Sequence, residues 1–289
     1  MSWWLNCSII YRGNMAEVVP RARTTIAVLS DIHFPFEDPD ALRLARQIVQ
    51  DANPDIVCLN GDITDFFGIS RFPVPPIRRM QFASEISYAR DALAKLKSSF
   101  APDAQWIYIE GNHELRMKSF LWRRAPELAG LIGVETELQL EAQGIVYLRE
   151  RDEPAARYEF AAPQLRVGKL YIQHGTNIRI GSATINVARS VFLRLLKPML
   201  IGHWHRKDIY TQTDYEGTTS GCWVQGCLCK PRPHWDTGRI WGQGMSIVFA
   251  TEEHFEVDVI DFIGQPRKRT LMALWRGNRY EERMGGRRW

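Results

Sequence analysis

The sequence predicts an α/β protein whose first half contains a parallel βαβ unit. An apolar run at residues 26–30 (IAVLS) is followed by apolar residues at helical spacing over 42–49 and by a second apolar run at 56–59 (IVCL). Strand, helix and strand within roughly thirty residues is typical of a right-handed crossover between parallel strands. Over residues 209–263 the pattern changes to alternating, threonine-rich segments, which predict a second part rich in β-strands.

Further helices and strands follow from the same patterns. Pro39 is expected to begin the first helix, with Asp38 as its N-cap. The remaining expected helices are 80–100 and 182–196, and the remaining expected strands are 105–109, 170–173, 198–201, 246–251 and 255–262. Residues 115–165 have a mixed pattern, which predicts one or two helices and a hairpin.

The composition is that of a globular protein without a membrane span. The chain has 289 residues, of which 45% are hydrophobic, and it contains no run of about 18 apolar residues. The first ten residues have no basic residue ahead of their apolar core, so we do not expect a secretory signal, and Met15 is an alternative start. Five scattered cysteines do not form a disulfide framework, so we expect a reducing cytoplasm.

The positive charge of the chain is concentrated at its C-terminal end. Residues 265–289 contain eight Arg or Lys and two Glu, a net charge of +6, whereas the remainder has 29 basic and 31 acidic residues, a net charge of −2. The segment also contains Trp275, Tyr280 and Trp289. A basic segment with aromatic residues is compatible with a nucleic-acid contact, an oligomer contact or a solvated end.

Side chains that can bind metal ions follow five of the apolar runs. Asp31 and His33 come directly after the first run, and we expect them to point the same way because a strand places residues i and i+2 on one side. The carboxyl ends of parallel strands form the ligand crevice of α/β sheets. The residues that follow the other runs are Asp62, Asn112, His113, His174, His203 and His205. Taken singly, Asp31 could be a helix cap and His174 a core histidine; together, oxygen and nitrogen donors indicate a metal site.

These motifs resemble the five sequence blocks of the calcineurin-like metallophosphoesterase superfamily. The blocks are Asp31-x-His33, Gly61-Asp62, Gly111-Asn112-His113-Glu114, His174 and Gly202-His203-x-His205. All five occur in the family's order, and the chain is most similar to compact phage and bacterial members. The resemblance implies a four-layer αββα sandwich with two central mixed β-sheets. It divides the chain into an N-terminal extension (1–22), a metallophosphoesterase domain (23–264) and a basic tail (265–289).

The resemblance also implies two divalent or trivalent metal ions, chosen from Mn, Fe, Zn, Co and Ni. The implied ligands are Asp31, His33 and His205 for the first metal, Asp62 for both, and Asn112, His174 and His203 for the second. A hydroxide that bridges the metals would attack phosphorus in line. The implied catalytic residues are His113 and Asp62. His113 would stabilise the phosphate or protonate the leaving oxygen.

Other residues near these motifs have two interpretations each. Asp65 and Glu114 would support the ligands or cap local structure. Arg116 would bind the phosphate or form a surface salt bridge, and Trp204 would line the site or pack in the core. The substrate contacts that we expect are Asn112, His113, Arg116 and Trp204.

The cysteines and tryptophans of the last third also allow alternatives. Cys222, Cys227 and Cys229 could form a structural zinc site only with His234, and buried thiols fit the spacing better. Trp235 and Trp241 would stack on an aromatic part of the substrate or simply pack. We expect substrate choice to depend on the loops at 66–79 and 231–244.

The function predicted is that of a binuclear metal-dependent phosphoester hydrolase, and specifically a phosphodiesterase. The Arg-Gly pair that follows the second Asp in protein phosphatases of the family is replaced by Phe66-Phe67-Gly68, which disfavours that activity. One alternative is a nuclease for DNA or RNA that uses the basic tail as a backbone clamp. The other is a non-catalytic binding scaffold, which would be expected to have lost ligands.

Overall fold

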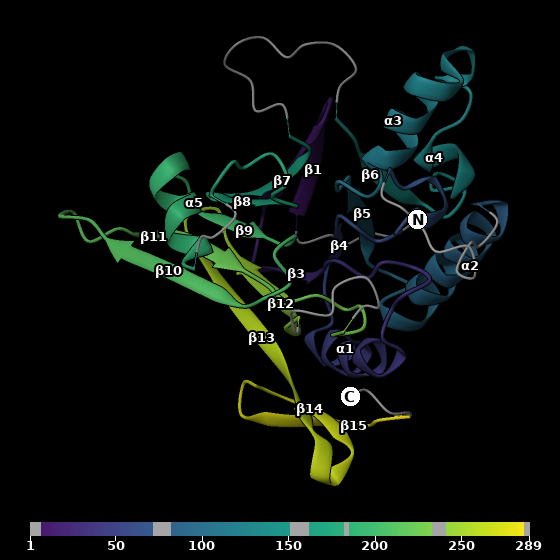
Figure 1. Ribbon diagram of the computed structural model, residues 1–289. Helices are drawn as coiled ribbons and strands as arrows, with labels where there is room; N and C mark the ends of the chain where they lie inside the picture. The colour runs from purple at the N-terminus through teal and green to yellow at the C-terminus, as the bar shows by residue number, and fades with distance from the viewer. Residues whose placement is uncertain (1–6, 72–81, 151–161, 182–184, 233–240, 286–289) are drawn as a thin grey trace.

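Two β-sheets lie face to face between layers of helices in the computed structural model, which describes residues 7–71, 82–150, 162–181, 185–232 and 241–285 (Figure 1). The eight-stranded sheet has the order β15 (Asn278–Arg283), β14 (Thr270–Trp275), β13 (Phe255–Gln265), β12 (Gln243–Ala250), β3 (Thr24–Leu29), β4 (Ile56–Asn60), β5 (Gln105–Ile109) and β6 (Ile145–Leu148). The seven-stranded sheet has the order β1 (Cys7–Arg12), β2 (Met15–Pro20), β7 (Gln164–Val167), β8 (Leu170–Gln173), β9 (Met199–Ile201), β11 (Thr219–Val224) and β10 (Asp208–Thr213).

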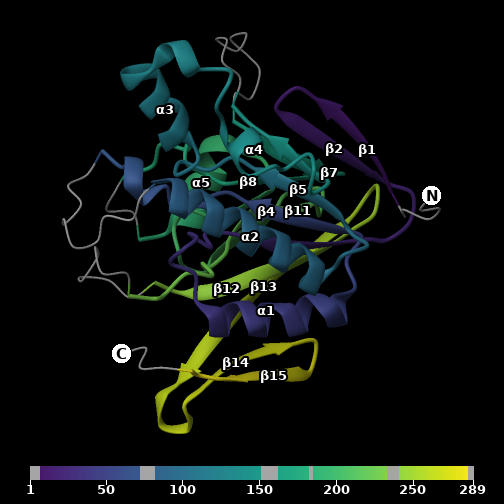
Figure 2. The ribbon, with the colours of Figure 1, turned by 90° about the vertical axis from the view of Figure 1, so that its right-hand side faces the viewer.

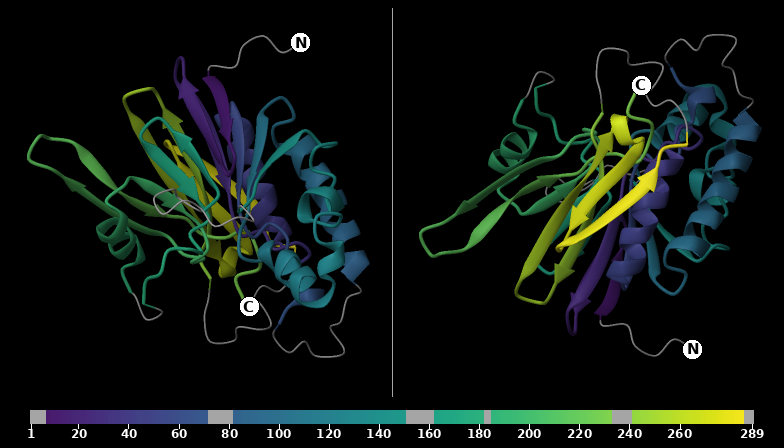
Figure 3. Two further views of the ribbon diagram at one scale, coloured as in Figure 1. Left: turned by 90° about the horizontal axis from the view of Figure 1, so that it is seen from above. Right: turned by 90° about the horizontal axis from the view of Figure 1, so that it is seen from below.

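Both sheets are mixed, and helices cover their outer faces (Figure 3). β3, β4, β5 and β6 are parallel to one another, whereas β12 runs antiparallel to β3. The helices on the eight-stranded sheet are α1 (Pro39–Ala52), α2 (Phe82–Phe100), α3 (Leu115–Arg124) and α4 (Val134–Glu137), and α5 (Val187–Leu195) covers the other sheet. Short 3₁₀ turns are η1 (Phe67–Ile69), η3 (Pro126–Leu128) and η4 (Pro266–Lys268). The predicted four-layer sandwich is therefore confirmed.

Alternating side chains of the central strands fill two separate cores. In β3, Ala27 and Leu29 pack with the helices, whereas Ile26 and Val28 pack between the two sheets. All four side chains are fully buried, as expected for a parallel strand covered on both faces. A third cluster, which includes Val191, lies between α5 and the seven-stranded sheet.

The first helix begins as the sequence predicts. Asp38 accepts hydrogen bonds from the backbone N–H groups of Asp40 and Ala41, and Pro39 occupies the first turn. The predicted helix at 80–100 is described from Phe82, and that at 182–196 begins at Val187 instead, with residues 182–184 outside the described part of the chain. No helix in the described ranges is long and apolar enough to cross a membrane.

Both ends of the chain add strands that the sequence patterns did not indicate. Within residues 1–22, β1 and β2 form a hairpin, and β2 pairs in parallel with β7. Within residues 265–289, β14 and β15 form a hairpin that lies against α1 (Figure 2), where Arg43 Nε donates to Glu282 at 2.6 Å. The described residues of 115–165 (115–150 and 162–165) do not form the expected hairpin, because β6 pairs in parallel with β5 and β7 pairs with β8.

Candidate metal centre

The loops after β3 and β4 stay paired beyond the strand ends. The Asp31 N–H donates to Gly61 O at 3.0 Å, and the His33 N–H donates to Asp62 O at 3.0 Å. Asp31 and His33 are therefore brought together at one sheet edge, but the predicted reason was wrong. β3 ends at Leu29, and both residues have φ of +55°, so they do not follow strand periodicity.

A left-handed backbone is common to most of the predicted ligands. Five of them have φ between +49° and +66°, namely Asp31, His33, Asp62, His203 and His205. This conformation costs about 1–2 kcal/mol for each non-glycine residue, so it persists only where surrounding contacts enforce it. All five residues lie two or four positions beyond the ends of β3, β4 and β9.

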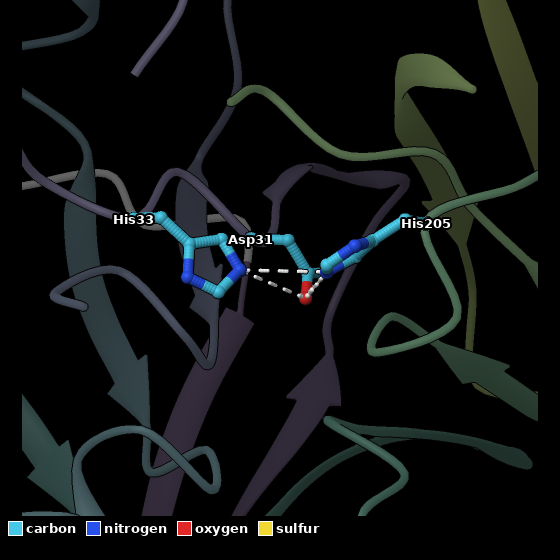
Figure 4. Close-up of side chains that lie close together, drawn as sticks. All are labelled: Asp31, His33 and His205. Atoms are coloured by element: carbon cyan, nitrogen blue, oxygen red, sulfur yellow. Dashed lines mark hydrogen bonds and ion pairs between the residues drawn. The ribbon is translucent and has the colours of Figure 1, made fainter. Parts of the chain in front are cut away.

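The first group of predicted ligands consists of Asp31, His33 and His205 (Figure 4). His205 Nε2 lies 2.9 Å from Asp31 Oδ1 and 3.4 Å from His33 Nε2. The second Asp31 oxygen accepts from the His203 N–H at 3.0 Å and from the Ser30 hydroxyl. One carboxylate oxygen and two imidazole nitrogens thus converge, with their ligand atoms within 4.8 Å of one another.

The second group consists of Asp62, His174 and His203. His174 Nε2 lies 3.2 Å from Asp62 Oδ2 and 3.3 Å from the Asn112 side-chain oxygen, which places Asn112 beside this group. The other ring nitrogen of His174, Nδ1, donates to Asn60 O at 2.8 Å, which leaves Nε2 free of a proton in the neutral ring.

His113 lies beside both groups. Its Nε2 is 3.8 Å from Asp62 Oδ2, and its ring is close enough to His33 and Asp62 to complete a third possible ligand group. However, Arg116 Nη2 lies 2.9 Å from His113 Nε2, and a cation on that nitrogen would face the guanidinium charge. This contact is compatible with the place beside the ligands that the resemblance implies for His113.

Two motif glycines are required by the close approach of the ligands. A Cβ at Gly61, where φ is +77°, would lie 2.5 Å from the His174 ring. A Cβ at Gly202 would lie 2.0 Å from the Ser30 hydroxyl oxygen and 2.7 Å from the Asp31 carboxylate. These glycines therefore allow the loops of the two sheets to approach each other closely.

Glu114 organises the loop that carries Asp62. Its fully buried carboxylate accepts six hydrogen bonds of 2.6–3.2 Å, from the backbone N–H groups of Gly111, Asp62, Ile63 and Thr64 and from the hydroxyls of Thr64 and Tyr108. Of the two predicted roles, support of a ligand is therefore the one observed. α3 begins at the next residue, but the Glu114 side chain makes no capping hydrogen bond to it.

Asp65 holds two histidines and an arginine at once. Its Oδ2 lies 3.1 Å from His33 Nδ1 and 3.3 Å from His113 Nδ1, and its Oδ1 accepts from Arg116 at 3.1 Å. Burial raises the pKa of Asp65, but hydrogen bonds from His113 and His33 outweigh this effect and hold the pKa far below its usual range. The ionised carboxylate fixes both rings through Nδ1 and directs their Nε2 atoms away from it.

Among the histidines of the two groups, His174 and His205 have raised pKa values, whereas His203 has a lowered one. Burial lowers the pKa of His174, but the Asp62 carboxylate outweighs it and raises the pKa to about 10. Asp31 likewise outweighs burial at His205 and raises its pKa to about 9. The pKa of His203 falls to about 4, because the ring is buried and faces His174. In the metal-free protein at neutral pH, protons on His174 and His205 therefore balance the two buried carboxylates.

This arrangement fits bound metal cations. Asp31 and Asp62 are 0% and 2% exposed, and the ion pairs of their carboxylates within the described ranges are with histidine rings. Each group offers one carboxylate and two imidazoles without a thiolate, a donor set that suits Mn, Fe, Zn, Co or Ni. A cation at each group would replace protons on the histidines and neutralise the buried carboxylates.

The other two predicted substrate contacts, Arg116 and Trp204, differ in their surroundings. Arg116 does not form a surface salt bridge, since its partner Asp65 is 2% exposed, and its side chain lines a pocket beside Asn112. Trp204 lies against the His203 ring and packs on the cluster beneath α5, which favours the packing interpretation. Trp241, for which stacking on the substrate and simple packing were the two expectations, packs against the His205 ring, with 4.0 Å between the ring centroids. Trp235 lies outside the described residues.

The cysteines are buried thiols. Cys222 belongs to the cluster beneath α5, and the backbone N–H of Cys229 donates to Asp31 O at 3.1 Å. Among the residues that the structure describes, no possible metal-ligand group includes a cysteine. His234, the fourth ligand that a zinc site would need, lies outside the described residues.

Some arginines in the described part of the basic tail form ion pairs within the protein. Arg276 pairs with Glu256 at 3.0 Å and with Asp258 at 3.1 Å, and its guanidinium lies over the Phe249 ring. Arg279 pairs with Glu281. These contacts weaken the argument that the tail acts as a free backbone clamp for nucleic acid.

Comparison with known proteins identifies the family. Residues 24–207, which contain all the predicted ligands, match the family model described as calcineurin-like phosphoesterase. The chain belongs to this family. It is 23% identical to the Gene 54 protein of Mycobacterium phage L5 over 254 residues, which cover 83% of this chain and 94% of that protein. The Gene 54 protein of Mycobacterium phage D29 is 24% identical over 254 residues, with the same coverage of both chains.

Two of the solved structures that resemble this family member do so at low similarity. Vps29 from Chaetomium thermophilum has 11% identity and a TM-score of 0.41, with 90% of this chain and 94% of that chain covered. A dimetal phosphatase from Danio rerio has 15% identity and a TM-score of 0.40, with 81% and 95% covered.

Proposed function

We propose that the protein hydrolyses phosphate esters, preferentially diesters, with two bound metal ions. The observation that carries the proposal is the position of Asp62. Its carboxylate shares one ligand group with His174 and His203, and it also lies within 4.8 Å of the ligand atom of His33 from the first group. A carboxylate that faces both groups can bridge two cations.

The residues that would hold the metals are those of the two groups. Asp31, His33 and His205 would bind the first ion, Asp62 both, and Asn112, His174 and His203 the second. Bound cations would neutralise the phosphoryl oxygens and supply hydroxide from water near neutral pH. Asn112 is neutral, so its side-chain oxygen would add a ligand without reducing the positive charge that holds the phosphate.

His113 and Arg116 would act on the substrate directly. Burial lowers the pKa of His113, but Asp62 and Asp65 outweigh burial and raise it above its ordinary value. Asp65 accepts a hydrogen bond from Nδ1, whereas Nε2 faces Arg116 Nη2 at 2.9 Å. Nε2 would therefore take up a second proton as Arg116 Nη2 turns to a phosphoryl oxygen, and could then pass that proton to the leaving oxygen. Arg116, anchored to Asp65 through Nη1, would bind a phosphoryl oxygen through Nη2.

The preference for diesters is supported by the space beside the centre. A pocket of about 510 Å³ is lined by Asn112 and Arg116 and continues along α3. A diester carries a second organic group that needs such space, whereas a monoester does not. A cytoplasmic location is part of the proposal, since all five cysteines are unpaired thiols.

The test is a metal-reconstitution assay. Metal-free protein is loaded with Mn, Fe, Zn, Co or Ni and assayed on bis(p-nitrophenyl) phosphate, p-nitrophenyl phosphate and single-stranded DNA. We expect hydrolysis of the diester to exceed that of the monoester with at least one metal. Faster monoester hydrolysis would contradict the diester preference, cleavage of DNA alone would favour the nuclease, and no hydrolysis with any metal would favour the binding scaffold.

His113→Ala separates catalysis from metal binding in the same assay. General acid–base groups typically contribute 10²–10⁴-fold, so we expect a rate loss of about that size with an unchanged metal content. The matched control is His254→Ala, because His254 lies in the turn between β12 and β13, outside the ligand groups. Loss of metal from His113→Ala would show instead that this ring is a ligand.

A further inference from the structure

The pocket beside the candidate centre has one continuous wall. Asn112, Leu115, Arg116, Ser119, Trp122 and Arg123 follow the spacing of a single helical face. The wall starts at a predicted metal ligand and runs away from it along α3. Ile69, the last residue of the 3₁₀ turn η1, and Arg71, which follows that turn, complete the lining.

The charges of this pocket all have one sign. Arg71, Arg116 and Arg123 line it, and no acidic side chain does so among the described residues. Arg123 Nε donates to Ser119 O at 2.9 Å, which folds the guanidinium back along the helix over the pocket. Arg123 lies two turns beyond Arg116, about 10 Å along the axis at about 1.5 Å per residue. The pocket therefore offers a second anion site at a fixed distance from the first.

An aromatic surface lies in the same pocket. Trp122 is 54% exposed, and Lys118, which does not line this pocket, has its Nζ over the Trp122 ring at 4.8 Å from the centroid. Leu115 and Ile69 add apolar surface to the pocket. An exposed indole beside cationic groups is suited to stacking on a planar, electron-rich ring.

We propose that this pocket binds the organic part of a nucleotide-type phosphodiester, with its base on Trp122 and a second phosphate on Arg123 and Arg71. The inference rests on the proposed function and names the substrate class of the same centre. A simple diester such as bis(p-nitrophenyl) phosphate would reach the centre and Arg116 without using Arg123. The pocket would therefore decide which diester is cleaved and not whether cleavage occurs.

The test compares three dinucleotides of deoxyadenosine on the Mn-loaded, full-length protein. One carries an extra phosphate at its 5′ end, one at its 3′ end and one carries none. We expect kcat/KM for one phosphorylated form to exceed that of the unphosphorylated form by about tenfold, the effect of one charge-assisted contact. Arg123→Ala should abolish this preference, and Arg124→Ala, the exposed neighbour that does not line the pocket, should keep it.

Trp122 is tested by the same substrates. Trp122→Ala should raise KM for all three dinucleotides by about tenfold with little change in kcat, and Trp122→Phe should restore most of the loss. Hydrolysis of bis(p-nitrophenyl) phosphate should stay within about twofold of wild type in every pocket variant.

The outcomes separate this inference from the proposed function. If the protein cleaves bis(p-nitrophenyl) phosphate but treats the three dinucleotides alike, or if Arg123→Ala keeps the preference, the inference is wrong and the proposed function stands. If no ester is cleaved, the proposed function fails. In that case, calorimetry measures the affinity of the phosphorylated dinucleotides for the wild type and for Arg123→Ala. Equal affinities would overturn the proposed role of the pocket in binding the second phosphate.

Discussion

The ligand cluster and the α3 pocket adjoin each other but are built in opposite ways. The cluster consists of buried and partly buried side chains on tight loops, and five of its members have a left-handed backbone. The pocket consists mainly of partly or fully exposed side chains on one face of a regular helix. Asn112 belongs to both regions, because it lies beside His174 and begins the pocket wall.

The difference indicates how tolerance to change is distributed. A residue of the cluster is held by several neighbours, so replacing it disturbs more than its own contact. A residue on the exposed face of α3 contributes little to folding and is free to vary with the substrate. Under the proposed function, the cluster would therefore fix the chemistry, and selectivity would be able to change along the helix.

The largest effect is expected for Asp62→Ala. Removing a carboxylate that faces both ligand groups should lower kcat/KM for bis(p-nitrophenyl) phosphate by about 10³-fold or more, since bound cations contribute several kcal/mol to such reactions. Metal content, measured by mass spectrometry, should fall as well. Asp91→Ala, at an exposed position of α2, is the control. Unchanged turnover in Asp62→Ala would refute the proposed role of this residue.

Glu114→Gln should have the next largest effect, and it acts on folding. The amide cannot accept from all the donors that now converge on the carboxylate, so buried N–H or O–H groups lose partners. We expect a loss of about 2–4 kcal/mol in the free energy of unfolding, measured by urea denaturation. Glu141→Gln, at an exposed position, should change stability by less than about 0.5 kcal/mol.

Metal binding should depend on pH in a direction set by His174 and His205. Their folded-state pKa values, about 10 and 9, are above the ordinary value, so both rings are protonated at pH 7.5 without metal. A cation must displace these protons, and affinity should therefore rise about tenfold per pH unit for each proton released until the pH passes the pKa. Titration calorimetry in buffers of different ionisation enthalpy should detect the release, and its absence would contradict the assignment of these ligands.

The smallest effect is expected for Arg123→Ala on stability. The side chain is exposed and its guanidinium hydrogen bond is to the helix backbone, so the free energy of unfolding should change by less than about 0.5 kcal/mol. A much larger loss in urea denaturation would show that the pocket wall also supports the fold, and the contrast with the cluster would then disappear.

The sequence predicted the position of the cluster well because strand ends are marked by composition. Apolar runs followed at once by Asp, Asn or His are visible without a structure. Parallel pairing then brings the carboxyl ends of β3, β4 and β5 to one edge of the sheet. It could not predict the left-handed turns at Asp31 and His33, since these depend on hydrogen bonds to Gly61 and Asp62 from another loop.

Other features depend on contacts between distant parts of the chain. β2 joins its sheet only by pairing with β7, and the β14–β15 hairpin packs on α1, so local patterns do not reveal either. The α3 pocket likewise needs η1 beside the helix. Its Arg71 belongs to the loop at 66–79 that was expected to influence substrate choice, although residues 72–79 lie outside the described part.

The place of β12 has a consequence for how this protein can be divided. The family match ends at residue 207, yet the strand that pairs with β3 opposite β4 is β12, which begins at Gln243. A fragment that stops at the end of the match would leave β3, the strand that leads into Asp31 and His33, with an open edge. Unpaired strand edges promote association between chains. The segment that carries the motifs therefore depends on β12, which lies outside the family match, to complete the pairing of β3.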